Sequence, residues 1–259
     1  MSVLDSIIAG VLEEQEHRQL SRTELDEKIL QSGAVRDPLL SLRSRPFSII
    51  SEVKRSSPSK GALATIADPA ALAHEYEVGG ASVVSVLTEN RRFGGSLEDF
   101  THVRNRISLP MLRKDFIVNE YLVRESRAYG ADLLLLIVAA LDGEKLQELY
   151  SLGKSLGMHV LVEVHNEAEL ERALAISPEI IGVNARNLKT LDIDMRAFSE
   201  LIPKIPGEIY RVAESGISTL EDVILARQSG ADAILVGEML VKSGSPRHVI
   251  SEFLSVGKD

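Results

Sequence analysis

One stretch shows the pattern that the rest of the chain repeats, a strand followed by a polar loop: Phe47-Ser48-Ile49-Ile50-Ser51-Glu52-Val53-Lys54-Arg55-Ser56-Ser57-Pro58-Ser59-Lys60-Gly61. Its apolar first half predicts a buried strand, and its Ser, Pro and Gly residues predict a loop after that strand. Because side chains alternate along a strand, Glu52 and Lys54 share one face and emerge together at the carboxyl end. The hydroxyl and amide groups of the loop are suited to bind an anion. The alternative is a solvated loop with an exposed ion pair, and the other strand ends decide between the two.

A short apolar run followed by a helical segment recurs along the chain from Phe47 onward. Strands are predicted at 47–53, 82–87, 109–113, 132–138, 159–164, 180–184, 208–213 and 233–236. Helices are predicted near 69–78, 97–106, 119–129, 142–156, 167–175, 194–202, 218–229 and 246–255. Continuous apolar strands separated by helices predict a parallel sheet covered on its outer face. Eight such units in about 210 residues predict a (β/α)₈ TIM barrel.

An internal repeat supports the barrel. Gly80-Ala81-Ser82, Gly130-Ala131-Asp132 and Gly230-Ala231-Asp232 each end a predicted helix and begin a predicted strand, and glycine is the usual residue after a helix. A doubly wound open sheet is the alternative, but it needs a point at which the strand order reverses. No G-x-G-x-x-G pattern follows any predicted strand, so a dinucleotide-binding fold is disfavoured.

The first 46 residues follow a different pattern. Residues 3–20 carry a helical apolar stripe, and a second short helix is predicted over 23–30. We therefore expect one domain over residues 1–259, with a helical extension at 1–46 packed on a barrel at 47–259.

The composition excludes several classes of function. The formal charge is −9 and no basic stripe is present, so nucleic-acid binding is disfavoured. There is no Cys, which excludes disulfides, thiolate metal sites and Cys nucleophiles. The start of the chain does not have the features of a signal peptide, and the longest apolar run, 133–141, is too short to cross a bilayer. We expect a cytoplasmic protein with no membrane or nucleic-acid partner.

Polar side chains end six of the predicted strands. They are Glu52 and Lys54 on the first, Lys114 on the third, Glu163 on the fifth, Asn184 on the sixth, Glu214 on the seventh and Glu238 on the eighth. The carboxyl ends of the strands form the active-site face of a TIM barrel. Burying several charges there is costly unless they pair with each other or with a ligand, which predicts a functional site. Arg113 and Asp115 flank Lys114 and should face outward, and His165 is expected to form hydrogen bonds in its loop.

Two glycine-containing loops predict a phosphate site. Ser215-Gly216 follows the seventh strand and leads into a helix, and Gly237-Glu238 follows the eighth. Loops at these two positions of a TIM barrel commonly hold phosphate through backbone N–H groups. Ser57 of the first loop is expected to complete the pocket. Glu238 would then contact phosphate through its backbone N–H, with its carboxylate turned away.

Five ordered segments resemble the indole-3-glycerol phosphate synthase family. They are Ser51–Gly61, Leu112–Ile117, Leu161–His165, Ile181–Leu188 and Ala213–Ile217. The resemblance covers residues 3–259, and it implies a monofunctional member, because the chain ends after one barrel. It implies a lyase of tryptophan biosynthesis that uses no cofactor and no metal. The substrate would be 1-(2-carboxyphenylamino)-1-deoxyribulose 5-phosphate, which closes its ring and loses CO₂ and water to give indole-3-glycerol phosphate.

The resemblance also implies residue roles. Lys114 would be the general acid and Glu163 the general base, while Lys54 would either hold the substrate carboxylate or act as a second acid. Glu52 would orient Lys54, and Asn184 and Glu214 would bind substrate hydroxyl groups or nitrogen. The substrate-binding set would comprise Ser57, Phe93, Phe116, Arg186, Leu188, Ser215, Gly216, Gly237 and Glu238, and the N-terminal helices would cover the mouth.

Two other functions fit the same strand ends. A Schiff-base aldolase would use Lys54 or Lys114 as its nucleophile. A non-catalytic barrel would bind phosphosugars without turnover. In each case the partner is a phosphorylated small molecule, and we expect a monomer or a weak homodimer.

Overall fold

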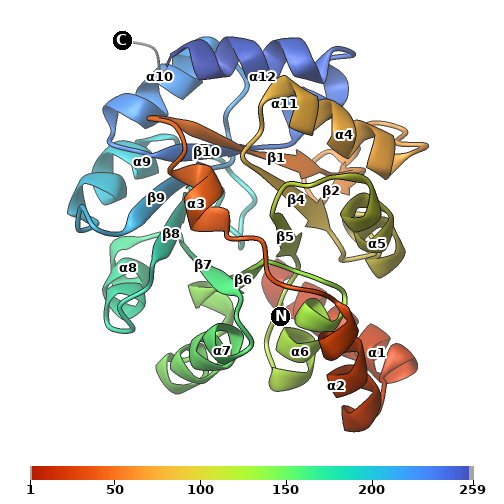
Figure 1. The fold of residues 1–259 in the computed structure, drawn as a ribbon. Helices are drawn as coiled ribbons and strands as arrows, with labels where there is room; N and C mark the ends of the chain where they lie inside the picture. The colour runs from red at the N-terminus through yellow and green to blue at the C-terminus, as the bar shows by residue number, and fades with distance from the viewer. Residues whose placement is uncertain (1, 257–259) are drawn as a thin grey trace.

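The computed structural model describes residues 2–256, in which eight parallel strands close into a barrel (Figure 1). The strands are β1 (Ser48–Val53), β4 (Val83–Leu87), β5 (Met111–Lys114), β6 (Leu133–Ile137), β7 (His159–Val164), β8 (Ile180–Asn184), β9 (Tyr210–Glu214) and β10 (Ala233–Val236). β1 closes the barrel because it pairs with both β4 and β10, and Ile50 lies opposite Val83 on one side and Leu235 on the other. The predicted (β/α)₈ barrel is confirmed.

A ring of helices covers the barrel from outside, as the alternating pattern predicted (Figure 1). The helices are α4 (Pro69–Gly79), α5 (Leu97–Arg106), α6 (Glu120–Ala128), α7 (Gly143–Ser155), α8 (Glu167–Leu174), α9 (Arg196–Leu201), α10 (Leu220–Gln228) and α12 (Pro246–Ser255). Six of them begin after an Asp, Asn, Ser or Thr whose side chain accepts a backbone N–H of the first turn. The three repeat glycines Gly80, Gly130 and Gly230 have φ values of 100°, 87° and 96°, the left-handed conformation that ends helices.

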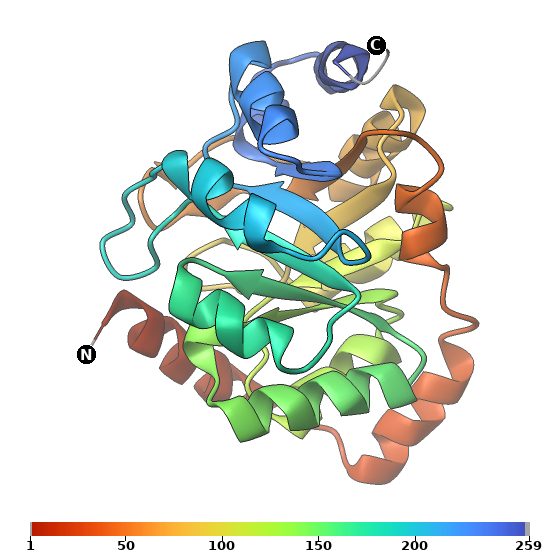
Figure 2. The ribbon, with the colours of Figure 1, turned by 90° about the vertical axis from the view of Figure 1, so that its left-hand side faces the viewer.

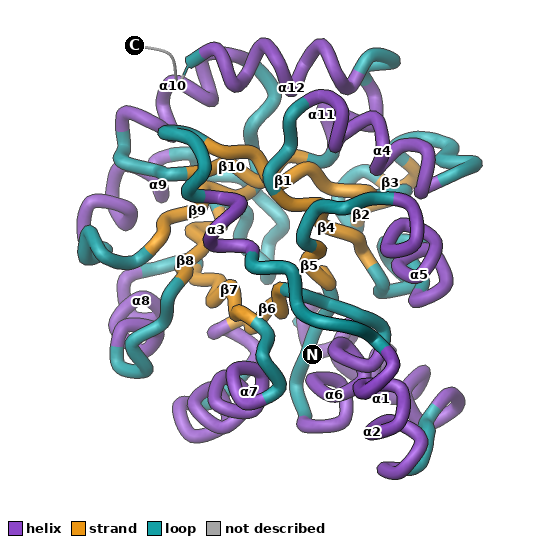
Figure 3. The backbone as a smooth tube through the Cα atoms, in the orientation of Figure 1, coloured by secondary structure: helices purple, strands orange, loops and turns teal. Residues whose placement is uncertain are grey.

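Some elements differ from the expected ones. The loop after β1 contains a small antiparallel hairpin, β2 (Ser56–Ser57) with β3 (Gly61–Ala62), and a short helix α11 (Glu238–Lys242) precedes α12 (Figure 3). α9 continues into a 3₁₀ turn at Ile202–Lys204, and β5 begins two residues later than expected. These elements are too short to produce a recognisable periodicity.

The N-terminal extension reaches both ends of the barrel (Figure 2). It consists of α1 (Val3–Arg18), α2 (Arg22–Gln31) and α3 (Pro38–Leu42). α3 lies at the amino ends of the strands, where Ser41 Oγ donates to Ser82 O at 2.6 Å and Tyr210 Oη donates to Leu42 O at 3.1 Å. α1 lies at the other end, where two of its apolar side chains line the cavity described below. Within residues 2–256, the helices lack the length and apolarity of a transmembrane span.

Candidate active site

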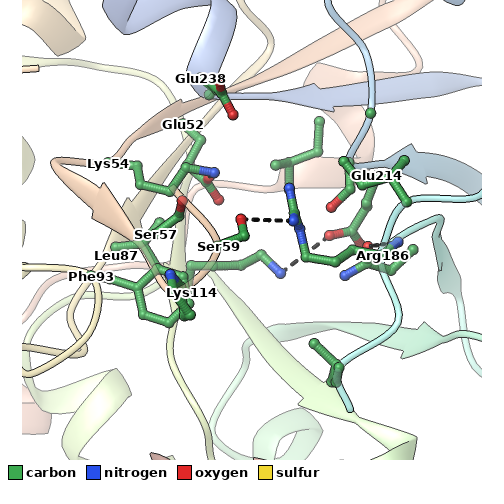
Figure 4. Close-up of a pocket in the computed structure, with 18 of the residues that line it drawn as sticks. Glu52, Lys54, Ser57, Ser59, Leu87, Phe93, Lys114, Arg186, Glu214 and Glu238 are labelled. Atoms are coloured by element: carbon green, nitrogen blue, oxygen red, sulfur yellow. Dashed lines mark hydrogen bonds and ion pairs between the residues drawn. The ribbon is translucent and has the colours of Figure 1, made fainter. Parts of the chain in front are cut away.

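A cavity of about 250 Å³ lies at the carboxyl ends of the strands (Figure 4). All fifteen residues that the sequence predicted for the site line it: Glu52, Lys54, Ser57, Phe93, Lys114, Phe116, Glu163, Asn184, Arg186, Leu188, Glu214, Ser215, Gly216, Gly237 and Glu238. They come from strands β1, β5, β7, β8 and β9, from the start of α11 and from the loops around these elements. The barrel therefore brings together side chains that are far apart in the sequence.

Lys114 lies at the centre of the charged cluster. Its Nζ donates to Glu163 Oε2 at 2.7 Å and lies 3.2 Å from Glu214 Oε2. The residues Glu163 and Glu214 are each only 1% exposed. Neither oxygen of Glu214 forms a hydrogen bond to any residue in the described part of the chain. A buried carboxyl group without such a partner indicates that a ligand completes the site.

The cluster sets the protonation of its members. Burial disfavours the charge on Lys114, but the carboxylates of Glu163, Glu214 and Glu52 outweigh burial and raise the Lys114 pKa above its ordinary value. Burial also disfavours the Glu163 charge, yet Lys114 and His165 hold the pKa of Glu163 well below its usual range. Burial and the neighbouring Glu163 raise the pKa of Glu214 to about 8, although Lys114 opposes that shift. At neutral pH the site thus holds a protonated lysine beside an ionised carboxylate and a neutral carboxylic acid.

Lys54 and Glu52 form the second charged pair. Lys54 Nζ lies 2.8 Å from Glu52 Oε1, and the Glu52 side chain is 4% exposed. A Cβ atom on Gly237 would lie 2.7 Å from Glu52 Oε1, so only glycine leaves room for this carboxylate. The sequence-based expectation that Glu52 orients Lys54 agrees with this geometry.

His165 contacts two carboxylates. Its Nδ1 lies 2.9 Å from Glu169 Oε2, and its Nε2 lies 3.2 Å from Glu163 Oε1. Burial opposes the imidazolium charge, but these two carboxylates raise the pKa of His165 to about 9. The sequence predicted that His165 forms hydrogen bonds in its loop, and it forms one with Glu169. Its contact with Glu163 was not predicted.

The loops after β9 and β10 form the polar side of the cavity. Ser215 and Gly216 both have a left-handed backbone conformation, with φ values of 66° and 82°. The left-handed conformation is costly for serine and is a feature of functional loops. A Cβ on Gly216 would lie 2.3 Å from Met195 Sδ. Across the cavity, Ser57 Oγ is buried and has no hydrogen-bond partner among residues 2–256, so the place predicted for phosphate contains an unsatisfied donor.

Two contacts hold the loop after β1 over this side of the cavity. Arg186 Nη1 donates to Ser59 Oγ at 2.9 Å (Figure 4). Lys60 Nζ donates to Glu238 Oε1 at 2.7 Å, and Lys242 Nζ donates to the same oxygen at 2.8 Å. The Glu238 carboxylate is therefore occupied by two lysines. The sequence analysis did not identify Lys60 and Lys242, because the loop and α11 approach each other only in the folded chain.

Apolar side chains form the remaining wall. The rings of Phe93 and Phe116 lie 6.1 Å apart with an angle of 38° between their planes. The apolar lining that the sequence analysis missed includes Leu4, Ile7, Leu87, Leu135 and Ile137. A flat aromatic group fits such a wall better than a fully polar sugar does.

Arg113 and Asp115 correct one expectation. Arg113 faces outward from the barrel as the strand alternation predicted, and it is fully buried against α6. Asp115, which was also expected to face outward, lines the cavity instead. Its Nη2 donates to Asp115 Oδ2 at 3.0 Å and to Glu125 Oε2 of α6 at 2.9 Å. Arg18 of α1 also donates to Glu125, at 2.9 Å and 3.0 Å. These residues form a charged network behind β5 and connect this strand to the N-terminal extension.

The arrangement is suited to proton transfer. A lysine held protonated is a proton donor, and the adjacent ionised carboxylate is a proton acceptor. A Schiff-base nucleophile needs a neutral amine, which the carboxylates around Lys114 disfavour. The cavity thus combines an acid, a base, a polar wall for an anion and an apolar wall for a ring.

Comparison with known proteins identifies similar sequences. Residues 4–253 match the family model described as indole-3-glycerol phosphate synthase. The protein of that name from Streptomyces griseus is 53% identical over 259 residues, which cover 99% of this chain and 96% of the relative. Indole-3-glycerol phosphate synthase 1 from Streptomyces coelicolor is 52% identical, with 100% of this chain and 97% of the relative covered.

Solved structures with low sequence identity share the fold. A thiamine phosphate pyrophosphorylase from Pyrococcus furiosus superposes with a TM-score of 0.60 at 15% identity, covering 84% of this chain and 98% of that one. A mandelate oxidase variant has a TM-score of 0.60 at 14% identity, covering 81% and 72%. At these identities the similarity concerns the barrel fold alone.

Proposed function

The chain belongs to the indole-3-glycerol phosphate synthase family, and from that premise we propose how the residues at its barrel mouth carry out the reaction. The enzyme is a decarboxylating lyase of tryptophan biosynthesis. It converts 1-(2-carboxyphenylamino)-1-deoxyribulose 5-phosphate into indole-3-glycerol phosphate, CO₂ and water. An aromatic carbon must attack the ketone and lose its carboxylate as CO₂, and the former ketone carbon must then lose its hydroxyl group as water.

Lys114 is the proposed general acid. As the ring carbon attacks, negative charge develops on the ketone oxygen, and a proton from the Lys114 ammonium neutralises it. The carboxylate of Glu163, 2.7 Å from Nζ, keeps Lys114 protonated. Loss of CO₂ then restores the aromatic ring.

Glu163 is the proposed base for the dehydration. Loss of the hydroxyl requires an acid at the leaving oxygen and a base for the proton that leaves carbon, and the low pKa of Glu163 keeps it ionised for the second role. Lys54, paired with Glu52 at 2.8 Å, is the second ammonium group in the cavity. It either holds the substrate carboxylate or protonates the leaving hydroxyl.

Substrate binding divides between the two walls of the cavity. We propose that Ser57 Oγ and the backbone N–H groups of Ser215, Gly216, Gly237 and Glu238 hold the phosphate, while the Glu238 carboxylate stays with Lys60 and Lys242. Phe93, Phe116 and Leu188 hold the anthranilate ring. Asn184 and Glu214 bind a substrate hydroxyl or nitrogen, which would give the Glu214 oxygens the hydrogen bond that they lack among residues 2–256. Arg186 orders the mouth through its contact with Ser59.

The 2.7 Å contact between Lys114 and Glu163 in a cavity with an aromatic wall carries this proposal. Indole formation from the carboxyphenylamino substrate, followed by fluorescence with EDTA present, tests it. Lys114→Ala and Glu163→Gln should each lower kcat by roughly 100-fold or more, the scale of a general acid or base. Turnover near that of the parent protein in either variant would remove the role assigned to that residue, and loss of activity with EDTA would contradict a metal-free reaction.

A matched control separates chemistry from folding. Lys145→Ala and Glu148→Gln change an exposed lysine–glutamate pair on α7, whose closest N–O distance is 2.8 Å. These variants should keep parental turnover, because exposed pairs contribute little. We also propose a monomer or weak homodimer located in the cytoplasm, which light scattering and cell fractionation would check.

A further inference from the structure

The two oxygens of Glu163 have different partners. Oε2 accepts the hydrogen bond from Lys114 at 2.7 Å, and Oε1 lies 3.2 Å from His165 Nε2. Lys114 is the proposed proton donor and lines the cavity, whereas His165 is not among the residues that line it. The carboxylate of the proposed base is thus held between the substrate side and a group behind it.

The ring of His165 is itself fixed. Its Nδ1 and its backbone N both lie 2.9 Å from Glu169 Oε2. Glu169, in the first turn of α8, receives a third hydrogen bond, because Asn166 Nδ2 donates to its Oε1 at 2.7 Å. The side chains of His165 and Glu169 are 9% and 16% exposed. Three donors on Glu169 leave the imidazole little freedom to rotate away from Glu163.

We propose that His165 is a positioning residue for the general base: Glu169 orients its ring so that Nε2 holds the Glu163 carboxylate ionised and directed toward Lys114. This inference rests on the proposed role of Glu163. Nε2 lies within ion-pair distance of Glu163 Oε1 but does not have hydrogen-bond geometry toward it, so the fixed imidazolium acts on this carboxylate as a positive charge at a defined place. His165 acts through Glu163 and does not touch the substrate cavity.

The charged groups around Glu163 show how much of its ionisation depends on His165. Lys114 faces it from β5, Glu214 from β9, and the Glu52–Lys54 pair lines the same cavity from β1. Asn184 of β8 is uncharged, and the β6 side chains Leu135 and Ile137 are apolar. His165 and Lys114 are thus the cations that lower the pKa of Glu163. Loss of His165 leaves Lys114 as the cation that holds Glu163 ionised.

The sign of the effect on the pH profile follows. Without the His165 cation the pKa of Glu163 rises, so the base becomes protonated, and inactive, at a higher pH than in the parent enzyme. The acidic limb of the kcat profile should move to higher pH. The loss is then greatest at low pH and shrinks as the pH rises, whereas a purely structural defect lowers kcat by a similar factor at every pH.

Two substitutions at position 165 provide a matched comparison. In His165→Gln the amide nitrogen can occupy the place of Nε2 and still reach Glu163, whereas in His165→Asn it takes the place of Nδ1 and reaches only Glu169. The measurement is kcat against pH for both variants and for Glu169→Gln. We expect the ratio of parental to His165→Asn kcat to increase toward the lowest pH at which the folded enzyme can be assayed, by up to about tenfold for each unit by which the pKa of Glu163 rises. His165→Gln should retain more activity than His165→Asn, and Glu169→Gln should shift the limb in the same direction.

Three results would overturn the inference. They are an unchanged acidic limb in all three variants, a loss that is equal at every pH, or equal activity of the Gln and Asn variants. If the position-165 variants melt below the assay temperature, the Glu169→Gln profile decides alone, because His165 remains in place. Glu163→Gln separates the two proposals: if it keeps parental turnover, the proposed base is wrong, and if it is inactive while the other profiles are parental, only the role of His165 is wrong.

Discussion

At the scale of single residues, Glu214 shows how burial creates a functional group. Its carboxyl group is 1% exposed and lies 3.2 Å from Lys114. A Cβ on Gly182 of β8 would lie 2.0 Å from Glu214 Oε1, so the neighbouring strand carries glycine where the carboxyl group needs space. Burial and the adjacent Glu163 favour the neutral acid. A neutral carboxyl group can donate a hydrogen bond to substrate, which an ionised one cannot do.

The protonation of Glu214 predicts a pH-dependent stability difference. Because its pKa is raised to about 8 in the folded protein from an ordinary 4.5, the folded state retains a proton that the unfolded state releases between these values. The stability that this bound proton contributes is fully present below the pKa of Glu214 in the unfolded chain, and it is lost as the pH rises through the pKa of Glu214 in the folded protein. Glu214→Gln removes this titration. Its free energy of unfolding relative to the parent should rise by more than about 1.4 kcal/mol, the value of one pKa unit, between roughly pH 5 and pH 8.

Urea unfolding of both proteins across that pH range measures the difference. Exposed Glu148→Gln serves as the control and should show a constant offset. A Glu214→Gln offset that is also independent of pH would mean that Glu214 ionises normally in the folded protein.

At the scale of elements, the alternation of side chains along β5 places two basic residues on opposite faces of the strand. Lys114 faces the cavity, and Arg113 faces α6, where it meets Glu125. Arg18 binds the other side of the same carboxylate, so one glutamate joins β5, α6 and α1. We infer that this network holds the catalytic strand and the N-terminal helix in a fixed relation.

Removal of Glu125 should be strongly destabilising. Glu125→Ala leaves the fully buried Arg113 with Asp115 as its remaining ion-pair partner among residues 2–256, and breaking a buried ion pair typically costs about 3–5 kcal/mol. Glu148→Ala, which breaks an exposed pair on α7, should cost no more than about 1 kcal/mol. Chemical denaturation measures both, and equal costs for the two variants would show that the network contributes nothing beyond a surface pair.

At the scale of the whole molecule, the N-terminal extension contacts the barrel at its mouth and at its opposite end (Figure 2). Leu4 and Ile7 line the cavity, whereas α3 lies against the amino ends of the strands. We propose that barrel and extension unfold together as one domain. Ile7 is 5% exposed, so a wall of the active site belongs to a segment outside the barrel.

Ile7 is therefore expected to affect binding more than chemistry. Ile7→Ser removes apolar area worth about 1.5–3 kcal/mol, which should raise KM by roughly tenfold or more, while kcat stays near the parental value because Lys114 and Glu163 are unchanged. Ala9→Ser, on the exposed face of the same helix, is the matched control. Steady-state kinetics measures both variants, and a fall in kcat at parental KM would place Ile7 in the chemical step instead.

The sequence by itself determined the barrel and predicted which strand-end residues line the cavity at its mouth. Strand and helix periodicities are local, so eight units could be counted from apolar runs and glycines such as Gly130 and Gly230. Parallel strands end at one face, so a polar residue at each strand end, such as Lys114 or Glu163, was enough to predict a shared cavity.

Only the tertiary structure decided which charges pair and which segments close the cavity. Whether Lys114 contacts Glu163, whether His165 lies behind that carboxylate, and whether Arg113 is buried depend on distances of a few ångströms between distant segments. The position of Ile7 in the cavity wall and the contacts of Lys60 and Lys242 with Glu238 also depend on such distances. No periodicity records such distances, because they follow from how helices and loops pack around the closed barrel, and this packing sets the pKa of each buried group.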